Sequence, residues 1–198
     1  MIKNLLHIIT VLAMAVAVVS CAVAPIDVNR VLELKPDQKI YTAYNIWYEN
    51  KDDISQLNYH KGKILPFGTE VNIFEATKES VVFQDINTCD TYRVVFIRRN
   101  QIARTELYFK NLFTLKNAET STSGIKPEIL EKIKSGAVEK GMTKREVLLS
   151  YGYPAPHRTP SLNDNTWIYF DDVVKNKRVI FSTKGFVLEI MKDEQEKK

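Results

Sequence analysis

The sequence predicts an α+β protein in which a β-rich part is followed by two helices and three strands. Short runs of β-branched and aromatic residues, separated by turn residues, fill much of the first half of the chain. A polar stretch follows, after which apolar residues recur at helical spacing before short strands return. With 198 residues, the chain is long enough for two small domains or one ordinary domain.

An apolar segment opens the chain. Lys3 gives it a positive start, Leu5 to Val19 is almost wholly apolar, and Ser20 leads into Cys21. These are the three parts of an export signal. The run Val18-Val19-Ser20-Cys21 resembles the lipobox of bacterial lipoproteins, in which an aliphatic residue, a tolerant position and a small residue precede the cysteine.

The resemblance implies that residues 1–20 are a lipoprotein signal peptide and that Cys21 carries the acyl chains. Ala22 stands where inner-membrane lipoproteins tend to have aspartate, which implies an outer-membrane location facing the periplasm. The alternative is an uncleaved transmembrane anchor, because the apolar run continued to Ala24 has roughly the 20 residues of a span. The absence of a basic stop-transfer flank favours the lipoprotein.

Residues 21–37 are expected to form a tether, because after the cysteine they have no clear period and contain Pro25 and Pro36. The formal charge of the whole chain is +4 and is well mixed along it. Such a charge gives no argument for a nucleic-acid partner.

Residues 38–116 are predicted to be a β-rich module. Its strands are expected at 40–48, 70–76, 80–86, 91–97 and 105–113, where β-branched and aromatic residues gather. The stretch from Lys61 to Ala76 resembles the part of SH3-like barrels in which a Pro/Gly kink leads into a hairpin. Several short strands with tight turns over about 75 residues predict a small β-barrel or sandwich, and the resemblance implies an SH3-like one.

Residues 117–126 are predicted to be a linker, with four Ser/Thr and one Gly in ten positions. Pro127 is well placed in the first turn of a following helix. The apolar residues Ile129, Leu130, Ile133 and Val138 would form its buried face, and Gly141 is expected to end it.

A second helix is predicted to begin at Thr143. Thr143 and Glu146 have the spacing of a capping box, and Gly152 is expected to end the helix after Val147, Leu148 and Tyr151. Three strands are expected at 166–171, 177–182 and 186–191, with a polar tail at 193–198. The helices should cover one face of this antiparallel sheet.

The last third of the chain resembles the SmpA/OmlA (BamE-like) family of outer-membrane lipoprotein domains. The family pattern has a Gly-Met-Thr opening, a short helix ending in Gly-x-Pro, a Trp-x-Tyr strand and a hairpin with glycine at its turn. The matching residues are Gly141, Met142, Thr143, Val147, Gly152, Pro154, Trp167, Tyr169, Phe181, Gly185 and Val187. The match covers about residues 125–192, and the chain departs from the family plan in having a β-rich module before it.

This resemblance implies a non-enzymatic, protein-binding adaptor whose candidate partner is the β-barrel assembly machinery. Each matching residue also has a structural role as a helix cap or core residue. The segment 153–165 is the predicted partner-binding site, because three prolines lower the cost of ordering it. Its candidate contact residues are Tyr153, His157, Arg158, Asn163 and Asp164. The alternative is an ordinary solvated connection.

No catalytic, metal or cofactor site is predicted. A cysteine nucleophile would need Cys89 beside His60 or His157, and these histidines fall in different modules. Cys89 is expected to be buried between two apolar strands, with pairing between chains as the alternative. The acidic pairs Asp52-Asp53 and Asp171-Asp172 are expected in solvated turns.

Two surface features leave alternatives open. The basic run Arg98-Arg99 to Arg104 could meet anionic lipid headgroups or the wall polymer, or be a solvated strand end. An alternative function is binding of peptidoglycan by the SH3-like module. Its candidate platform is the aromatic set of Tyr41, Tyr44, Trp47, Tyr48 and Tyr59, although such aromatics are more often core residues.

Overall fold

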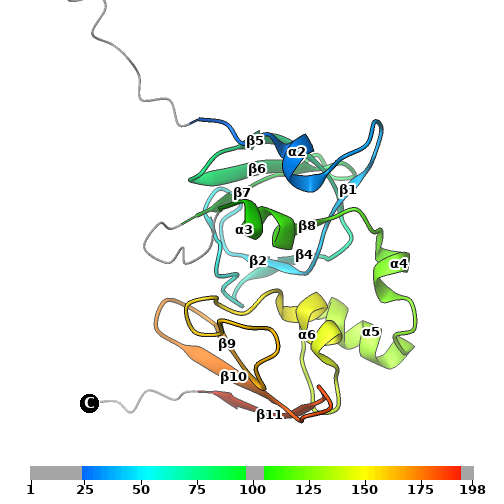
Figure 1. Cartoon of the computed structure of the whole chain (residues 1–198), viewed down its shortest axis with the longest axis vertical. Helices are drawn as coiled ribbons and strands as arrows, with labels where there is room; N and C mark the ends of the chain where they lie inside the picture. Colours follow the sequence, from blue (N-terminus) through cyan, green and yellow to red (C-terminus); the bar gives the residue numbers. More distant parts are fainter. Residues whose placement is uncertain (1–23, 97–104, 193–198) are drawn as a thin grey trace, which may run out of the picture.

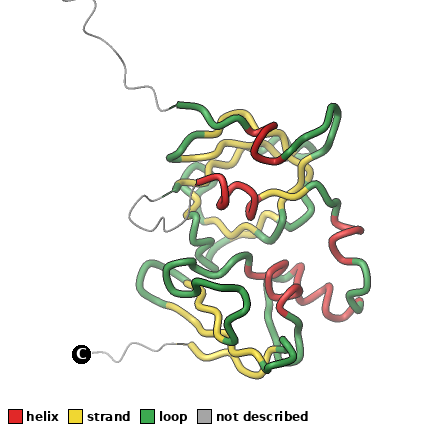
Figure 2. The backbone as a smooth tube through the Cα atoms, viewed as in Figure 1, coloured by secondary structure: helices red, strands yellow, loops and turns green. Residues whose placement is uncertain are grey.

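The computed structural model describes residues 24–96 and 105–192. In these residues the chain is a mixed α+β protein, as predicted. Figures 1 and 2 show two halves stacked along the long axis. The upper half contains a curled β-sheet with short helices, and the lower half contains two further helices and a smaller sheet. The signal segment, Cys21, the run Arg98 to Arg104 and the tail 193–198 lie outside the described residues.

The first half contains most of the strands. Its elements are α2 (Val28–Leu32), β1 (Ile40–Thr42), β2 (Ile46–Tyr48), β3 (Ile54–Ser55), β4 (Lys63–Leu65), β5 (Glu70–Ala76), β6 (Ser80–Asp85), β7 (Thr91–Val95), α3 (Thr105–Leu112) and β8 (Phe113–Thr114). Six strands form one sheet in the order β3-β7-β6-β5-β1-β8, and β2 pairs with β4 separately. All neighbours are antiparallel except the parallel pair β3–β7.

The core of this half follows from alternating side chains on the strands. Val81 and Phe83 on β6 are fully buried, and Tyr92 and Val94 on β7 face the same cluster. Phe109 of α3 is also fully buried and packs beside Phe113, with ring centroids 5.5 Å apart. The helix therefore completes the core that the sheet begins.

The strand predicted at 105–113 is wrong for all but its last residue. Residues Thr105–Leu112 form helix α3, and Thr105, Tyr108, Phe109 and Leu112 are the buried ones. This is the i, i+3, i+4, i+7 spacing of a helix that buries one face. The aromatic composition favoured a strand, whereas the spacing of the buried positions is helical.

The strand predicted at 40–48 is interrupted. Its middle residues bond to other parts of the chain, because the Ala43 amide donates to the Leu112 carbonyl and the Asn45 amide donates to the Leu149 carbonyl. The segment therefore pairs in the large sheet as β1 and, after the interruption, pairs with β4 as β2. The alternation of side chains in the sequence does not indicate these long-range hydrogen bonds, so the interruption could not be predicted from it.

The predicted tether and linker each contain a short helix. In the tether, Asp27 caps α2 and Val31 is buried in the first core. In the linker, Asn117 caps α4 (Ala118–Thr122), and the Thr122 hydroxyl donates to the Ala118 carbonyl. Side-chain caps at Asp27 and Asn117 thus order stretches whose composition favoured loops.

The second half contains α5 (Pro127–Lys134), α6 (Lys144–Tyr151) and the antiparallel sheet of β9 (Thr166–Phe170), β10 (Asn176–Phe181) and β11 (Val187–Lys192). The Thr143/Glu146 capping box and the Gly152 cap are confirmed. Helix α5 ends at Lys134, earlier than the predicted Gly141, because Gly136 takes a left-handed φ of +69° against the Trp47 ring.

The helices pack onto one face of the small sheet. Trp167 and Tyr169 on β9 are almost fully buried against Ile133, Met142 and Val147. The Tyr169 hydroxyl donates to the Gly152 carbonyl at 3.0 Å. These two aromatics therefore tie the sheet to the end of α6.

The two halves are joined by buried hydrogen bonds. The side-chain amide of Asn58 donates to the carbonyls of Asn45 and Tyr151, and the His60 ring Nε2 lies 2.9 Å from the Tyr151 carbonyl. The His60 backbone amide also donates to the Phe170 carbonyl. Hydrophobic packing crosses the same junction, because Phe67 enters the second core and Tyr153 packs on the first.

Candidate functional site

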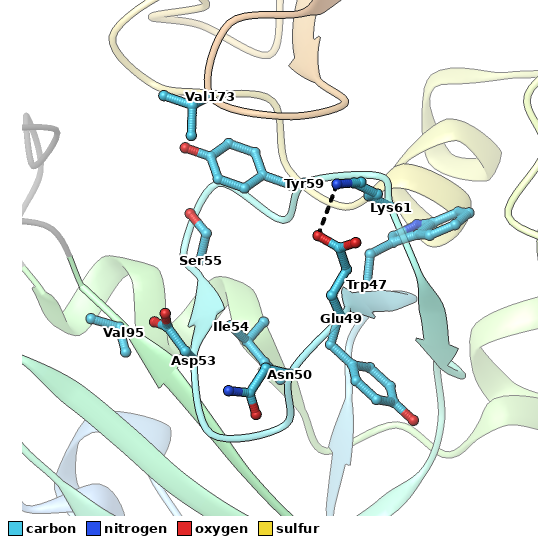
Figure 3. A pocket seen from close by; sticks show the side chains of 11 residues that line it. Trp47, Glu49, Asn50, Asp53, Ile54, Ser55, Tyr59, Lys61, Val95 and Val173 are labelled. Carbon is cyan, nitrogen blue, oxygen red and sulfur yellow. Dashed lines mark ion pairs between the residues drawn. The ribbon is translucent and has the colours of Figure 1, made fainter.

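An open pocket of about 350 Å³ lies where the first half meets the turn between β9 and β10 (Figure 3). The aromatic residues Trp47, Tyr48 and Tyr59 contribute to its lining. Val173 closes one side from the second half and is 76% exposed. The first half therefore forms most of the pocket, and the second half adds one wall residue.

The backbone around Asn58 positions the aromatic side chains. Asn58 takes a left-handed φ of +51°, and its side-chain oxygen accepts a 2.9 Å bond from the Trp47 amide. Asparagine tolerates this conformation better than most residues. The turn places Tyr59 in the pocket lining while the His60 ring packs on Tyr151 in the second half.

Polar groups complete the pocket lining. Glu49 and Lys61 form an ion pair of 3.1 Å whose side chains are 61% and 56% exposed. Figure 3 shows this pair beside Tyr59, with Asn50 and Asp53 on the neighbouring loop. Aromatic faces surrounded by carboxylate, amide and amine groups can hold a polar ring or a short peptide, because the faces stack and the polar groups form hydrogen bonds.

The structure brings together three of the five predicted platform aromatics. Trp47, Tyr48 and Tyr59 line the pocket. Tyr44 is buried in the first core, where its ring packs edge-on to Tyr153, so for Tyr44 the core alternative is confirmed and the platform role is excluded. Tyr41 pairs with Glu70 and Thr114 on the large sheet and lies outside this pocket.

Sequence reasoning missed the polar lining of the pocket. Glu49, Asn50, Asp53 and Lys61 read individually as surface turn residues. Val173 is distant in sequence from all of them. The four polar residues come together within the first half, in the loops around β2 and β3, and the packing of the two halves adds Val173.

The first residues of segment 153–165, from Tyr153 to His157, form its base and pack at the junction between the two halves. The Tyr153 ring lies 6.0 Å from that of Tyr44, Ala155 is buried, and its amide donates to the Ile168 carbonyl. His157 stacks on Phe170 at 5.9 Å, and burial together with the charge of Arg158 lowers the pKa of His157. Tyr153 and His157 are therefore occupied by contacts within the protein.

Residues 161–164 form the tip of the same segment, which is largely exposed and held by hydrogen bonds. Lys144 Nζ donates 2.8 Å bonds to the carbonyls of Leu162 and Asp164, and the Asp164 carboxylate accepts from the Ser161 amide. Asn163 and Asp164 remain exposed, as does Arg158 nearer the base. The structure thus divides the five predicted contact residues between a packed base and an accessible remainder.

A group of ionisable side chains is buried beside the junction. Lys177 Nζ forms a 2.6 Å ion pair with Asp171 and lies 4.4 Å from the centre of the Tyr151 ring. Burial lowers the pKa of Lys177, and Asp171 partly offsets this effect. Burial and the Lys177 charge lower the pKa of His60 to about 3, so that ring is neutral at pH 7.

Cys89 is exposed, so the prediction that it is buried is wrong. It lies in the tight turn between β6 and β7 with a left-handed φ of +59°, and its amide donates to the Asp85 carbonyl. In this five-residue connection between two core strands, residues 86–89 are all exposed. Cys89 is thus on a different element from either histidine.

Asp52 and Asp53 lie exposed in a turn, as predicted, whereas Asp171 and Asp172 lie in a bend where both are half-buried and Asp171 pairs with Lys177. Asp172 Oδ1 accepts bonds from the amides of Val174 and Lys175, and these bonds lower the pKa of the Asp172 carboxyl. Within residues 24–96 and 105–192, no group of three or more His, Cys, Asp or Glu side chains could hold a metal ion.

The chain matches none of the protein-family models, curated proteins or solved structures with which it was compared. Among the helices of the described residues, none combines the length and apolar character needed to cross a membrane.

Proposed function

We propose that this chain is a non-enzymatic lipoprotein of the outer membrane that acts as a protein-binding adaptor in envelope or β-barrel assembly. The lipobox ending at Cys21 and the following Ala22 support the anchor and its location. The order α5-α6-β9-β10-β11, with its caps at Thr143 and Gly152, supports the BamE-like likeness of the second half. The curled sheet supports an SH3-like likeness of the first half.

The observation that carries the adaptor proposal is the ordered tip of segment 153–165. Its base is fixed by Ala155, and its tip by two hydrogen bonds from Lys144. The tip still exposes Leu162, Asn163 and Asp164 to solvent. A partner that binds such a tip pays little further conformational entropy, because the loop already holds one shape.

In-cell photocrosslinking of the full-length protein tests this proposal. A photoreactive residue at Asn163 is expected to capture envelope proteins, with barrel-assembly components among the dominant ones. The matched control is Lys184, which is also exposed, at the turn before β11. Equal capture at both positions, or none at Asn163, would contradict the adaptor proposal.

A second candidate is binding of peptidoglycan in the pocket lined by Trp47 and Tyr59. Its support is the combination of aromatic faces with the Glu49–Lys61 pair and Asp53, which suits amino-sugar rings. Sedimentation of the full-length protein with purified sacculi tests it. Tyr59→Ala should abolish co-sedimentation and Tyr41→Ala should leave it unchanged, because Tyr41 lies outside this pocket. Failure of the unmodified protein to sediment would exclude this candidate.

A further inference from the structure

The described part of the chain starts close to the residue proposed to carry the lipid. Pro25 forms an isolated antiparallel bridge with Thr77, and the Ile26 amide donates a 2.7 Å bond to the Ala76 carbonyl. Ile26 packs on the first core, where Val31 of α2 is buried. The chain is therefore fixed to the end of β5 from Pro25 onward.

Chain length limits how far this point can lie from the bilayer. Four residue steps separate Cys21 from Pro25, and an extended chain covers at most about 3.6 Å per residue, so the two Cα atoms are within about 14 Å. The radius of gyration of a folded body of this size is about 15 Å. With acyl chains on Cys21 in the hydrocarbon, Pro25 and the adjoining end of β5 therefore stay within about one radius of gyration of the bilayer surface.

An exposed aromatic side chain lies beside the same attachment point. Phe74 on β5 is 59% exposed and lies two residues before Ala76. The pairing of β5 with β6 is irregular there, since Ile73 faces Phe83 and Glu75 faces Val82, which leaves Phe74 without a partner. A bulge of this kind re-aims a side chain, and here it leaves a phenyl ring in solvent.

We infer that the β5–β6 end of the protein rests on the lipid headgroups, with Phe74 as its apolar contact. This inference depends on the proposed lipidation of Cys21. Aromatic side chains favour the membrane interface, and Lys78 in the β5–β6 turn can meet anionic headgroups. Glu75 and Glu79 are also exposed there, so the contact relies on the anchor and Phe74 rather than on net charge.

The arrangement of the two halves determines which of them would lie farther from the bilayer. In Figure 1 the chain enters at the end of the molecule that holds α2 and β5, whereas β11 lies at the opposite end. The second half, with its small sheet, is therefore held away from the bilayer. Leu188 on β11 is 53% exposed, which nearly matches Phe74 and provides a control position far from the membrane.

Depth-dependent quenching of the full-length, lipidated protein in phosphatidylcholine–phosphatidylglycerol vesicles tests the inference. An environment-sensitive fluorophore is attached to Phe74→Cys or Leu188→Cys in a Cys89→Ser background, and spin-labelled lipids are the quenchers. The label at position 74 should lose most of its emission, and the label at 188 should keep it. No quenching at 74, or equal quenching at 188, would overturn the inference.

A second variant separates the role of the aromatic ring from that of the anchor. Here the fluorophore is attached at Lys78→Cys. The additional substitution Phe74→Ser should weaken quenching, whereas Leu188→Ser, the control, should not. Unchanged quenching in Phe74→Ser would show that Phe74 is not the contact. Mass spectrometry of Cys21 distinguishes failure of the proposed lipid anchor from failure of the proposed orientation. An unmodified Cys21 refutes the anchor itself, whereas a lipidated Cys21 with an unquenched label at 74 refutes only the orientation.

Discussion

The side-chain amide of Asn45 in the first half donates a 2.6 Å hydrogen bond to the Ile133 carbonyl at the end of α5. The Asn45 side-chain oxygen accepts from the Phe67 amide, and its backbone amide donates to the Leu149 carbonyl. Asn45 is completely buried. One side chain therefore satisfies backbone groups from both halves, and neither half alone has all of its partners.

Asn45→Ala should lower the free energy of unfolding by about 2–4 kcal/mol, because it leaves two buried backbone groups without partners. Thermal unfolding in mild detergent measures this loss. Asn72→Ala is the matched control, since Asn72 is exposed on β5 and its loss should change stability little. A small effect of Asn45→Ala would mean that water or a local shift replaces its bonds.

Gly136→Ala should disturb the contact between the halves. A Cβ at this position would overlap the Trp47 ring and lie 2.7 Å from Ile64 Cδ1, and Gly136 has a φ of +69°. Gly124 has a φ of +80° but open space around it, so Gly124→Ala reports the backbone cost alone, about 1 kcal/mol. Gly136→Ala should cost about 1–3 kcal/mol more. Equal losses in urea unfolding would show that the overlap is relieved without cost.

The neutral His60 ring makes stability depend on pH. Its pKa is lowered from 6.5 to about 3, so the unfolded chain binds a proton below pH 6.5 that the folded chain does not. Stability from this group is therefore full above pH 6.5 and falls as pH decreases toward 3, by up to about 1.4 kcal/mol per pH unit.

His60→Gln provides the test, because glutamine keeps a donor for the Tyr151 carbonyl but does not titrate. The variant should be less stable at pH 7, where it loses ring contacts with Trp47 and Tyr169. Between pH 6.5 and 4 its stability should fall less steeply than that of the unmodified protein in urea unfolding. Parallel pH profiles would mean that His60 ionises normally in the folded state.

The native protein should have one reactive thiol. Cys89 is exposed in its turn, and a lipidated Cys21 has no free thiol. Maleimide labelling of full-length protein in detergent, counted by mass spectrometry, should give one label without denaturant and none in Cys89→Ser. A label on Cys89→Ser would contradict lipidation, and an unreactive Cys89 would contradict its exposure.

Local patterns predicted the parts of the fold whose causes are local. The Thr143/Glu146 capping box, the Gly152 cap and the last three strands depend on neighbouring residues, and they occur where expected. Helix α3 has the spacing of a helix, but its aromatic residues have high β propensity, so composition outweighed periodicity in the prediction.

The candidate sites depend on contacts that no local pattern encodes. The interruption after Thr42 arises because the Asn45 amide bonds to Leu149, over a hundred residues away. Likewise, Val173 completes the pocket with Tyr59, and Tyr153 is withdrawn into a contact with Tyr44. Single-sequence reasoning could name these residue types as candidates, but it could not predict which of them long-range packing would bring together or bury.

The exchange of Phe67 and Tyr153 between the two cores has a mechanical consequence. A flexible pair of domains would absorb a pull on one end by bending at the linker, whereas these halves interlock. If the acyl chains hold one end and a partner binds the tip at Asn163, a pulling force is transmitted through packed side chains of both halves. The two halves then act as one rigid body, and its length sets the distance between the bilayer and the partner.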